Sequence, residues 1–256
     1  MEKLRYLPVL MYHNVIDKKT AKKWNNFHVE TIQFEKQMDI LVKRGYTCLN
    51  FEDLENILKG QKESPEKPVM ITFDDAYLET INNVIPILAL RKLKSVFSVV
   101  TGCIGKKSNW EKEIDGSLTI SEEQIQKYTG TLVSFESHTE NHAYLAMCSV
   151  QDAERDLVNS KNTLESITGK KVRAVFYPYG NYNENVKSCA SKAGYMFGIA
   201  IASSKRTVLQ DYFEIRRVFI KPTDSLVDFK RKIAPWYIWF RGFREACRAW
   251  RRRHDE

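Results

Sequence analysis

The chain of 256 residues lacks the features that mark membrane, exported and repeat proteins. No apolar run approaches the ~20 residues that a membrane-spanning helix needs. The apolar run near the charged start is broken by Pro8 and is too short for a signal-peptide core of roughly 7–15 residues. No internal repeat or low-complexity segment is present. With 43% hydrophobic and 28% charged residues, we expect an ordinary globular protein that stays in the cytoplasm.

Cysteines are few and widely spread. The five of them, Cys48, Cys103, Cys148, Cys189 and Cys247, are odd in number and form no C-x-x-C pair. This spacing supports neither a disulfide framework nor a thiolate metal site. We expect free thiols in a reducing compartment.

The net charge of +8 is concentrated near the C-terminus, where residues 231–256 carry eight basic and three acidic side chains. Aromatic and apolar side chains recur there at helical spacing, and arginines occupy the neighbouring face. The aromatic and apolar set is Trp236, Trp239, Phe240, Phe243, Cys247 and Trp250, and the arginines are Arg241, Arg244, Arg248, Arg251 and Arg252. We therefore separate a domain at 1–233 from a basic amphipathic helix or tail at 234–256.

The composition of this tail is typical of an interfacial helix that binds anionic lipid. The alternative is that its aromatic side chains cover the underside of the folded domain while its arginines are solvated. Nucleic-acid binding is not expected, because neither a base-reading motif nor a basic body accompanies the tail.

Short β-rich runs alternate with helical patterns along the domain. Strands are predicted at 9–12, 69–73, 95–100, 132–135, 172–176 and 196–201, and helices at 34–44, 77–93, 120–128, 150–168 and 184–193. Such alternation implies parallel strands joined by crossover helices. The fold is therefore an α/β barrel or a doubly wound sheet, and periodicity alone does not separate the two.

Two adjacent carboxylates, Asp74 and Asp75, directly follow the predicted strand 69–73. Proteins of α/β class place their active sites at the carboxyl ends of strands. Neighbouring residues there point in different directions, so one carboxylate can hold a metal while the other faces substrate or water. The alternative is that the pair caps the helix that begins near Tyr77.

Two histidines, His138 and His142, follow another predicted strand. Imidazoles four residues apart converge on one ion if the chain turns there like a helix. Together with Asp75 they make a 2-His-1-carboxylate set, which leaves coordination positions open for water and substrate. Their coincidence with Asp75 favours a metal site over surface decoration, whereas the separate His28 is expected at the surface.

A third loop, Tyr177-Pro178-Tyr179-Gly180, follows the predicted strand 172–176. Proline fixes φ and glycine permits a sharp turn, so this loop is rigid. A rigid aromatic loop suits the wall of a sugar site, with backbone N–H groups that face a reacting carbonyl.

In this order, residues 72–75 (Thr-Phe-Asp-Asp), 137–142 (Ser-His-Thr-Glu-Asn-His) and 177–180 resemble the polysaccharide deacetylase family, whose members are NodB-like domains of carbohydrate esterase family four. The stretches 8–15 and 34–46 are similar to its branch of poly-N-acetylglucosamine deacetylases. The resemblance covers roughly residues 8–220. It implies a distorted (β/α) barrel with fewer strands than the eight-stranded type.

The resemblance also implies chemistry. Asp75, His138 and His142 would bind a divalent metal, usually Zn²⁺, with Co²⁺, Ni²⁺ or Mn²⁺ as substitutes. Asp74 would be the general base, and the backbone N–H of Tyr179 would help to stabilise the oxyanion. Tyr177, Pro178 and Tyr179 would line the substrate site. Bound Zn²⁺ polarises a carbonyl and lowers the pKa of its water towards ~7, which suits hydrolysis of an unreactive N-acetyl amide.

The chain departs from the family pattern at two places. The late Leu-x-His motif that supplies the general acid in many members is missing, and Tyr177 stands where they carry an arginine before the proline. His13, at the end of the first predicted strand, is the candidate acid, with a structural histidine as the alternative. Arg217 matches an arginine of the same branch and is placed with the substrate site, where it orients a carboxylate or has a structural role. Arg173 is not an obvious replacement.

The predicted activity is metal-dependent hydrolysis of the N-acetyl group of an amino sugar, with release of acetate. The substrate would be an N-acetylated glycan or a lipid-linked precursor from surface-polysaccharide or lipopolysaccharide biosynthesis. The expected location is the cytoplasm, with peripheral contact of the tail at the inner face of the membrane. Two alternatives are a catalytically weak glycan-binding protein that kept the metal site, and a deformylase that acts on a lipid-linked sugar.

Overall fold

The structure of the chain is a computed structural model that describes residues 4–19, 24–108, 110, 117–203, 205 and 207–252. Residues 238 and 249–252 are described by their backbone alone. The side chains of Trp250, Arg251 and Arg252, which belong to the expected pattern of the tail, therefore lie outside the described part.

Within the described residues, a parallel sheet of nine strands forms the centre of the fold. Its strands are β1 (Val9–Tyr12), β4 (Thr47–Cys48), β5 (Pro68–Phe73), β6 (Ser95–Val99), β7 (Val133–Ser137), β8 (Ala174–Phe176), β9 (Phe197–Ala200), β10 (Ile215–Arg216) and β11 (Val218–Phe219). They follow the order β10-β9-β8-β7-β6-β5-β1-β11, and β4 pairs with β5. A separate parallel pair joins β2 (Asn14–Ile16) to β3 (His28–Glu30).

The sheet curls into a nearly closed barrel. Its two edge strands, β10 and β11, are separated in the chain by Arg217 alone, so Arg217 lies in the seam between the two ends of the sheet. The barrel is confirmed over the doubly wound sheet. The family resemblance implied fewer than eight strands in the barrel, and this is wrong. Eight strands follow one another from β10 to β11, although β10 and β11 have only two residues each and flank Arg217.

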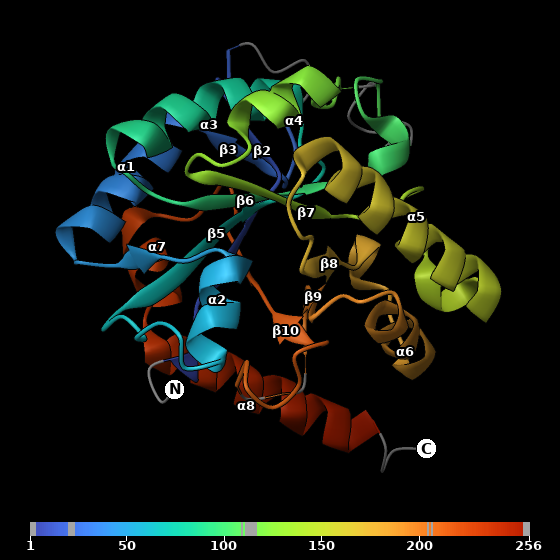
Figure 1. Cartoon of the computed structure of the whole chain (residues 1–256). Helices are drawn as coiled ribbons and strands as arrows, with labels where there is room; N and C mark the ends of the chain where they lie inside the picture. The colour runs from blue at the N-terminus through green and yellow to red at the C-terminus, as the bar shows by residue number, and fades with distance from the viewer. Residues whose placement is uncertain are drawn as a thin grey trace.

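Helices surround the barrel (Figure 1). They are α1 (Thr31–Lys43), α2 (Phe51–Leu58), α3 (Leu78–Leu90), α4 (Glu122–Tyr128), α5 (Val150–Thr168), α6 (Glu184–Lys192), α7 (Leu226–Lys232) and α8 (Pro235–Arg252). Short 3-10 helices lie at Thr101–Cys103, Leu145–Met147 and Pro178–Gly180. The five helices predicted for the domain are confirmed as α1, α3, α4, α5 and α6. In the described part of the chain, no helix is both long and apolar enough to cross a bilayer.

Side chains alternate along the strands between two apolar clusters. On β5, for example, Met70 lies in the cluster inside the barrel, whereas Ile71 packs in the cluster between sheet and helices. Helix α2 adds Phe51 and Leu54 to the inner cluster. Because α2 precedes β5 in the chain, it closes the amino-terminal end of the barrel and leaves the carboxyl-terminal end for a site.

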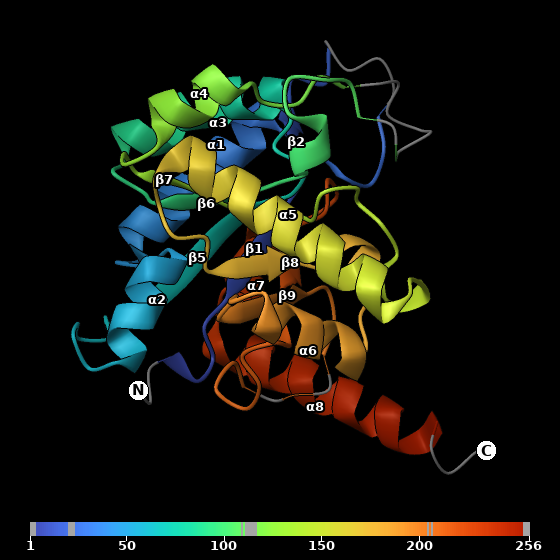
Figure 2. The same ribbon diagram turned by 45° about the vertical axis from the view of Figure 1, so that its right-hand side comes forward.

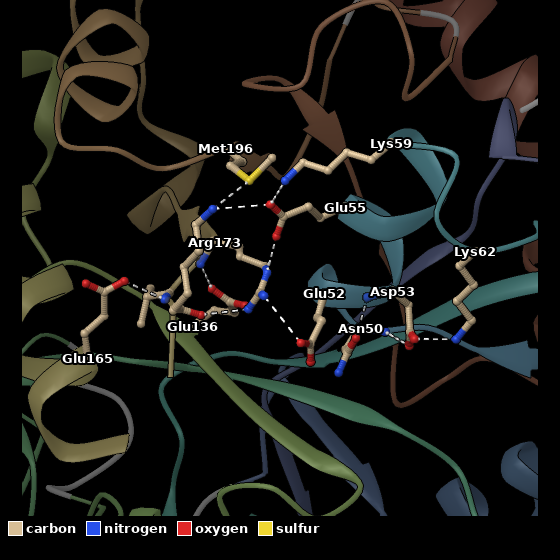
Figure 3. Close-up of polar contacts among 12 residues, drawn as sticks. Asn50, Glu52, Asp53, Glu55, Lys59, Lys62, Glu136, Glu165, Arg173 and Met196 are labelled. Carbon is tan, nitrogen blue, oxygen red and sulfur yellow. Dashed lines mark hydrogen bonds and ion pairs between the residues drawn. The ribbon is translucent and has the colours of Figure 1, made fainter. Parts of the chain in front are cut away.

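A polar network occupies that amino-terminal end (Figure 3). Arg173 Nε donates to Glu55 of α2 at 2.6 Å. The buried carboxyl group of Glu136 accepts hydrogen bonds from the backbone N–H groups of Arg173 and Ala174, each at 2.7 Å. Arg173 is therefore committed far from the carboxyl ends of the strands, in agreement with the expectation that it replaces no family arginine.

Helix α8 lies along the lower edge of the molecule in both views (Figure 1 and Figure 2). Its inner face is fixed by Glu245, which accepts from the backbone N–H of Ser203 at 3.0 Å and from Arg216 at 2.9 Å. Its outer face carries large aromatic side chains that are 41–57% exposed, namely Trp236, Trp239, Phe240 and Phe243. These aromatic side chains are thus about half covered by the rest of the structure and half exposed.

Candidate active site and metal centre

The predicted site residues gather around one cavity of about 360 Å³. The elements that supply them end at the same rim, because all the strands of the barrel are parallel. The lining consists of His13, Asn25, Phe27, Asp74, Asp75, Trp110, His138, His142, Tyr177, Tyr179, Ile201 and Arg217. Of the residues expected at the site, Pro178 alone is not part of this lining.

Asp75, His138 and His142 form a buried cluster whose ligand atoms all lie within 4.8 Å of one another. Asp75 Oδ1 is 3.7 Å from His138 Nε2 and 3.5 Å from His142 Nε2. Ligand atoms about 2.0–2.1 Å from a tetrahedral zinc ion lie about 3.4 Å apart. The donor set and its spacing therefore fit a divalent cation such as Zn²⁺.

The two histidines converge through a turn and not through the helical geometry that their spacing suggested. Thr139 and His142 have positive φ angles of 68° and 53°, and Asp75 has φ of 66°. The Thr139 hydroxyl accepts the backbone N–H of His142 at 3.0 Å and holds this turn. Such backbone conformations are costly for residues other than glycine, and they cluster at functional sites.

The alternative of a helix cap for the two carboxylates is not realised. Helix α3 begins at Leu78, and its N-cap residue is Tyr77. Asp74 and Asp75 are both 2% exposed and face the cavity.

The imidazole of His138 is held in the orientation that a metal ligand needs. Its Nδ1 lies 2.8 Å from the carbonyl oxygen of Phe176, which only accepts, so Nδ1 carries the proton and Nε2 keeps a lone pair towards Asp75. Burial lowers the pKa of His138 and lowers that of His142 to about 2. Both imidazoles are therefore neutral at ordinary pH, which is the form that binds metals.

Asp74 is held as a buried carboxylate. Arg217 Nη1 donates to Asp74 Oδ1 at 2.6 Å, and the Ser98 hydroxyl donates to the same oxygen at 2.9 Å. Burial alone would raise the pKa of Asp74, but Arg217, together with His13 and His138, outweighs it, and the pKa lies well below its ordinary value. Asp74 is therefore ionised, and Arg217 lies against the candidate base in the seam of the barrel.

His13 lies on the other side of Asp74. Its Nε2 is 3.6 Å from Asp74 Oδ2, and its ring packs on Phe27 with centroids 4.7 Å apart. Burial lowers the pKa of His13 to about 4, although Asp74 favours the protonated form. The structure thus brings His13, Asp74 and the three candidate metal ligands to one cavity.

His28 was expected at the surface, and this expectation is wrong. Its side chain is buried, because Nδ1 accepts the backbone N–H of Asn25 at 3.0 Å and the ring of Trp24 stacks on it. His28 supports the loop that carries Asn25 and Phe27 to the cavity.

The two tyrosines of the aromatic loop after β8 differ in burial. Tyr177 is buried, and its hydroxyl donates to the carbonyl of Phe213 at 3.1 Å. Gly198 makes room for this hydroxyl, because a Cβ there would overlap it. Tyr179, at φ of 58°, is 40% exposed and stacks on Tyr144 at 4.0 Å.

Several residues around the cavity were not predicted from the sequence. Ser98 was within reach, since the alternation of β6 places it on the inner side with Val96. Trp110 stacks on His142 at 4.7 Å, and Phe27 packs on His13. These aromatic residues come from loops, where periodicity carries no signal.

Comparisons with known proteins identify relatives of this chain. A family model described as polysaccharide deacetylase matches residues 61–198. Poly-β-1,6-N-acetyl-D-glucosamine N-deacetylase of Staphylococcus aureus is 26% identical over 210 residues, which cover 78% of this chain and 70% of that protein. A polysaccharide deacetylase from Bacillus cereus of known crystal structure is 27% identical, with a TM-score of 0.72 over 89% of this chain and 69% of that one.

The deacetylase PplD of Streptococcus pyogenes, solved in complex with acetate, shares the fold with a TM-score of 0.77 at 24% identity, over 90% of this chain and 98% of that one. Barrel, cavity and comparisons together define a hydrolase of carbon–nitrogen bonds other than peptide bonds. Within that class, the chain belongs to the polysaccharide deacetylase family, as the resemblance of its motifs predicted.

Proposed function

We propose that this protein removes N-acetyl groups from a polymer of N-acetylglucosamine and releases acetate. Asp75, His138 and His142 would hold a divalent cation, Zn²⁺ before Co²⁺, Ni²⁺ or Mn²⁺. The observation that carries the proposal is the buried cluster of these three side chains, which adjoins the ionised carboxylate of Asp74 in one cavity. The substrate follows the name of the Staphylococcus aureus relative.

The proposed chemistry divides between the ion and the side chains around it. A bound divalent cation supplies polarisation of the amide carbonyl and a lower pKa of water. Asp74 accepts one proton from the attacking water, a contribution of typically 10²–10⁴-fold in rate. Arg217 acts on Asp74 and holds it ionised and in place, which makes Arg217 a positioning residue in this proposal.

The leaving amine must gain a proton, and His13 is the group that we propose for this transfer. The hydroxyl of the water adds to the acyl carbon, and Asp74 holds the other proton of that water. This proton then moves from Asp74 to His13, whose Nε2 is 3.6 Å from Asp74 Oδ2. As the carbon–nitrogen bond breaks, the proton passes to the amine nitrogen. A pKa of about 4 means that the imidazolium of His13 gives this proton up readily.

The loop after β8 would form the substrate wall. The backbone N–H of Tyr179 would face the acyl oxygen, Pro178 would hold the turn, and the buried ring of Tyr177 would support the loop from below. These roles are carried over from the family resemblance, and Tyr177 and Tyr179 line the cavity.

The test is acetate release from oligomers of β-1,6-linked N-acetylglucosamine by the wild type and by Asp74→Asn. Asparagine keeps the shape of the side chain but cannot take the proton, so kcat should fall by at least about 10²-fold. Asp152→Asn, an exposed carboxylate on α5, is the matched control and should keep full activity. Full activity of Asp74→Asn would refute the assignment.

The same assay separates the other two functions that the sequence left open. Saturable glycan binding without acetate release, in the presence of Zn²⁺ or Co²⁺, would identify a glycan-binding protein. Release of formate from a formylated sugar in place of acetate would identify a deformylase.

We also propose that α8, within a tail at 234–256 beside a domain at 1–233, rests on an anionic membrane at its cytoplasmic face. The outward aromatic side chains of α8 support this, together with the exposed arginines Arg244 and Arg248. Aromatic rings enter the interface and arginines attract anionic headgroups. A lipid-linked precursor of a surface polysaccharide or lipopolysaccharide would then be within reach of the enzyme.

Co-sedimentation with vesicles tests the role of α8. The wild type should bind vesicles that contain phosphatidylglycerol more strongly than neutral ones, and the double variant Trp239→Ser, Phe243→Ser should lose this binding. Leu90→Ser, which is 80% exposed on α3, is the control. Equal binding by the wild type and the double variant would contradict the proposal.

A further inference from the structure

The two histidines of the candidate metal site lie at the two ends of residues 138–142, the ligand turn. Thr139 and His142 both have positive φ angles there, which are costly for residues with a side chain. Such a conformation persists only where the surrounding groups determine it. The groups that hold the ligand turn are therefore part of what brings the two imidazoles together.

The carboxyl group of Asp156, on helix α5, binds the middle of the ligand turn. Its Oδ1 accepts the backbone N–H of Glu140 at 2.7 Å. Its Oδ2 accepts the backbone N–H of Asn141 at 3.1 Å and the side-chain amide of Asn141 at 3.0 Å. We propose that Asp156 is a positioning residue, which fixes the ligand turn so that His138 and His142 are already placed for a divalent cation. The proposal goes beyond the proposed function but rests on its metal site.

Asp156 does not cap its own helix. Helix α5 begins at Val150, and Ser149 caps it by accepting the backbone N–H of Asp152 at 3.1 Å. Asp156 lies further along α5, beyond the first backbone N–H groups that a cap can serve, and its side chain is buried. A buried carboxyl group is costly unless it is hydrogen-bonded, and the three hydrogen bonds given above all come from the ligand turn. The side chain therefore serves the ligand turn and not the helix that carries it.

Helix α5 is itself fixed against the strand that leads into the ligand turn. Ser160 follows Asp156 by four positions on the same face of α5, and its Oγ lies 2.8 Å from the Oγ of Ser137. Ser137 ends β7, and its hydroxyl also accepts the backbone N–H of Thr139 at 3.1 Å. Asp156 is thus presented to the ligand turn from a helix whose position is defined.

A second set of hydrogen bonds holds the carbonyl groups of the ligand turn. The backbone N–H groups of Thr101 and Gly102, in the 3-10 helix after β6, donate to the carbonyl oxygens of Thr139 and Glu140 at 3.1 and 2.9 Å. Glycine is required at 102, because a Cβ there would lie 2.6 Å from the Glu140 carbonyl oxygen. The N–H and C=O groups of Glu140 are therefore bound by different elements. Loss of Asp156 removes the N–H half of this support and leaves the other half in place.

Loss of the Asp156 carboxyl group should weaken metal binding although no ligand is removed. The ligand turn would then also populate conformations in which the two imidazoles do not converge. An apparent affinity falls in proportion to the fraction of the protein in the competent conformation. Groups that orient metal ligands from outside the coordination shell typically contribute roughly 10- to 100-fold in affinity.

The test is the Kd of the metal-stripped protein for Zn²⁺, measured by competition with a chelator. Asp156→Ala should raise this Kd roughly 10- to 100-fold, and Asp156→Asn, which keeps one acceptor oxygen, should recover part of the affinity. Lys161→Met is the matched control, because Lys161 is another buried polar side chain of α5 and donates to the carbonyl oxygen of Val172 at 2.6 Å, outside the ligand turn. It should lose stability and keep the Kd of the wild type.

Hydrogen exchange of the metal-stripped protein gives a second readout that needs no metal. The backbone amides of Glu140 and Asn141 should exchange faster in Asp156→Ala than in the wild type, because they lose their acceptor. Lys161→Met should leave their exchange unchanged.

A Kd in Asp156→Ala equal to that of the wild type would overturn the proposal, and so would an equal rise in Lys161→Met or unchanged exchange in Asp156→Ala. If the wild type binds Zn²⁺ but releases no acetate, the proposed function fails, and the same two measurements still decide the role of Asp156. If the wild type binds no divalent cation, the metal site and this proposal fail together.

Discussion

Replacement of Arg217 by methionine should raise the pH below which acetate release is lost. Methionine has a similar length and suits a buried position, but it removes the guanidinium that lies 2.6 Å from Asp74 Oδ1. Burial, which favours the protonated carboxyl, then acts on Asp74 without its main opponent. A base must be ionised to accept a proton, so the acid limb of the pH profile should follow the pKa of Asp74.

The expected size of this shift comes from the contact that is lost. An arginine beside an aspartate lowers the carboxyl pKa by about 1–3 units, and a hydrogen bond to a charged group is worth about 1.5–3 kcal/mol. At about 1.4 kcal/mol per pKa unit, the two figures agree on a rise of about 1–2 units. Because one partner of a buried ion pair remains, the free energy of unfolding should also fall by about 3–5 kcal/mol near neutral pH.

The assay is kcat/KM for acetate release as a function of pH, with saturating Zn²⁺ and bound metal measured at each pH. Arg216→Met is the matched control, since Arg216 is the neighbouring residue and its guanidinium binds Glu245 at 2.9 Å and not Asp74. It should lose stability without a shift of the acid limb. An unchanged limb in Arg217→Met, or an equal shift in both variants, would refute the reasoning.

Two further predictions concern stability. Burial raises the pKa of Glu136 to about 8, so the folded state holds the proton of this carboxyl group more tightly than the unfolded state does. The free energy of unfolding should therefore fall as the pH rises from about 4.5 to 8. Urea denaturation should show a flatter pH dependence for Glu136→Gln, which keeps an acceptor for the backbone of Arg173 and Ala174, and an unchanged slope would contradict this. Gly198→Ala should cost about 1–3 kcal/mol in the same assay, because its Cβ would overlap both the Tyr177 hydroxyl and the Phe213 carbonyl oxygen. The cost should be smaller in combination with Tyr177→Phe, and equal costs in both backgrounds would refute the contribution of the hydroxyl.

The strands and helices with a periodic apolar pattern could be predicted from the sequence. The predicted strand 69–73 and the helix 150–168 carry regular apolar patterns, and they appear as β5 and α5. Strands β10 and β11 have two residues each and no pattern of their own. They are strands because β9 and β1 pair with them, which is a property of the closed barrel and not of the local sequence.

The candidate site divides in the same way. Asp74 and Asp75 were found because they end a recognisable strand, and the two histidines because their spacing suits a metal. The helical geometry suggested for the segment between the two histidines does not form. The turn found there depends on positive φ angles at Thr139 and His142, which the sequence does not reveal. The contact between Arg217 and Asp74 spans 143 positions, so nothing short of the closed barrel reveals it.

The central claim is that Asp75, His138 and His142 hold one divalent cation. Calorimetric titration of the metal-stripped protein with Zn²⁺ measures this directly. The account predicts one equivalent bound to the wild type and to His28→Ala, whose imidazole lies outside the cluster, and weak or no binding to His142→Ala. Tight stoichiometric binding by His142→Ala, equal to that of the wild type, would contradict it.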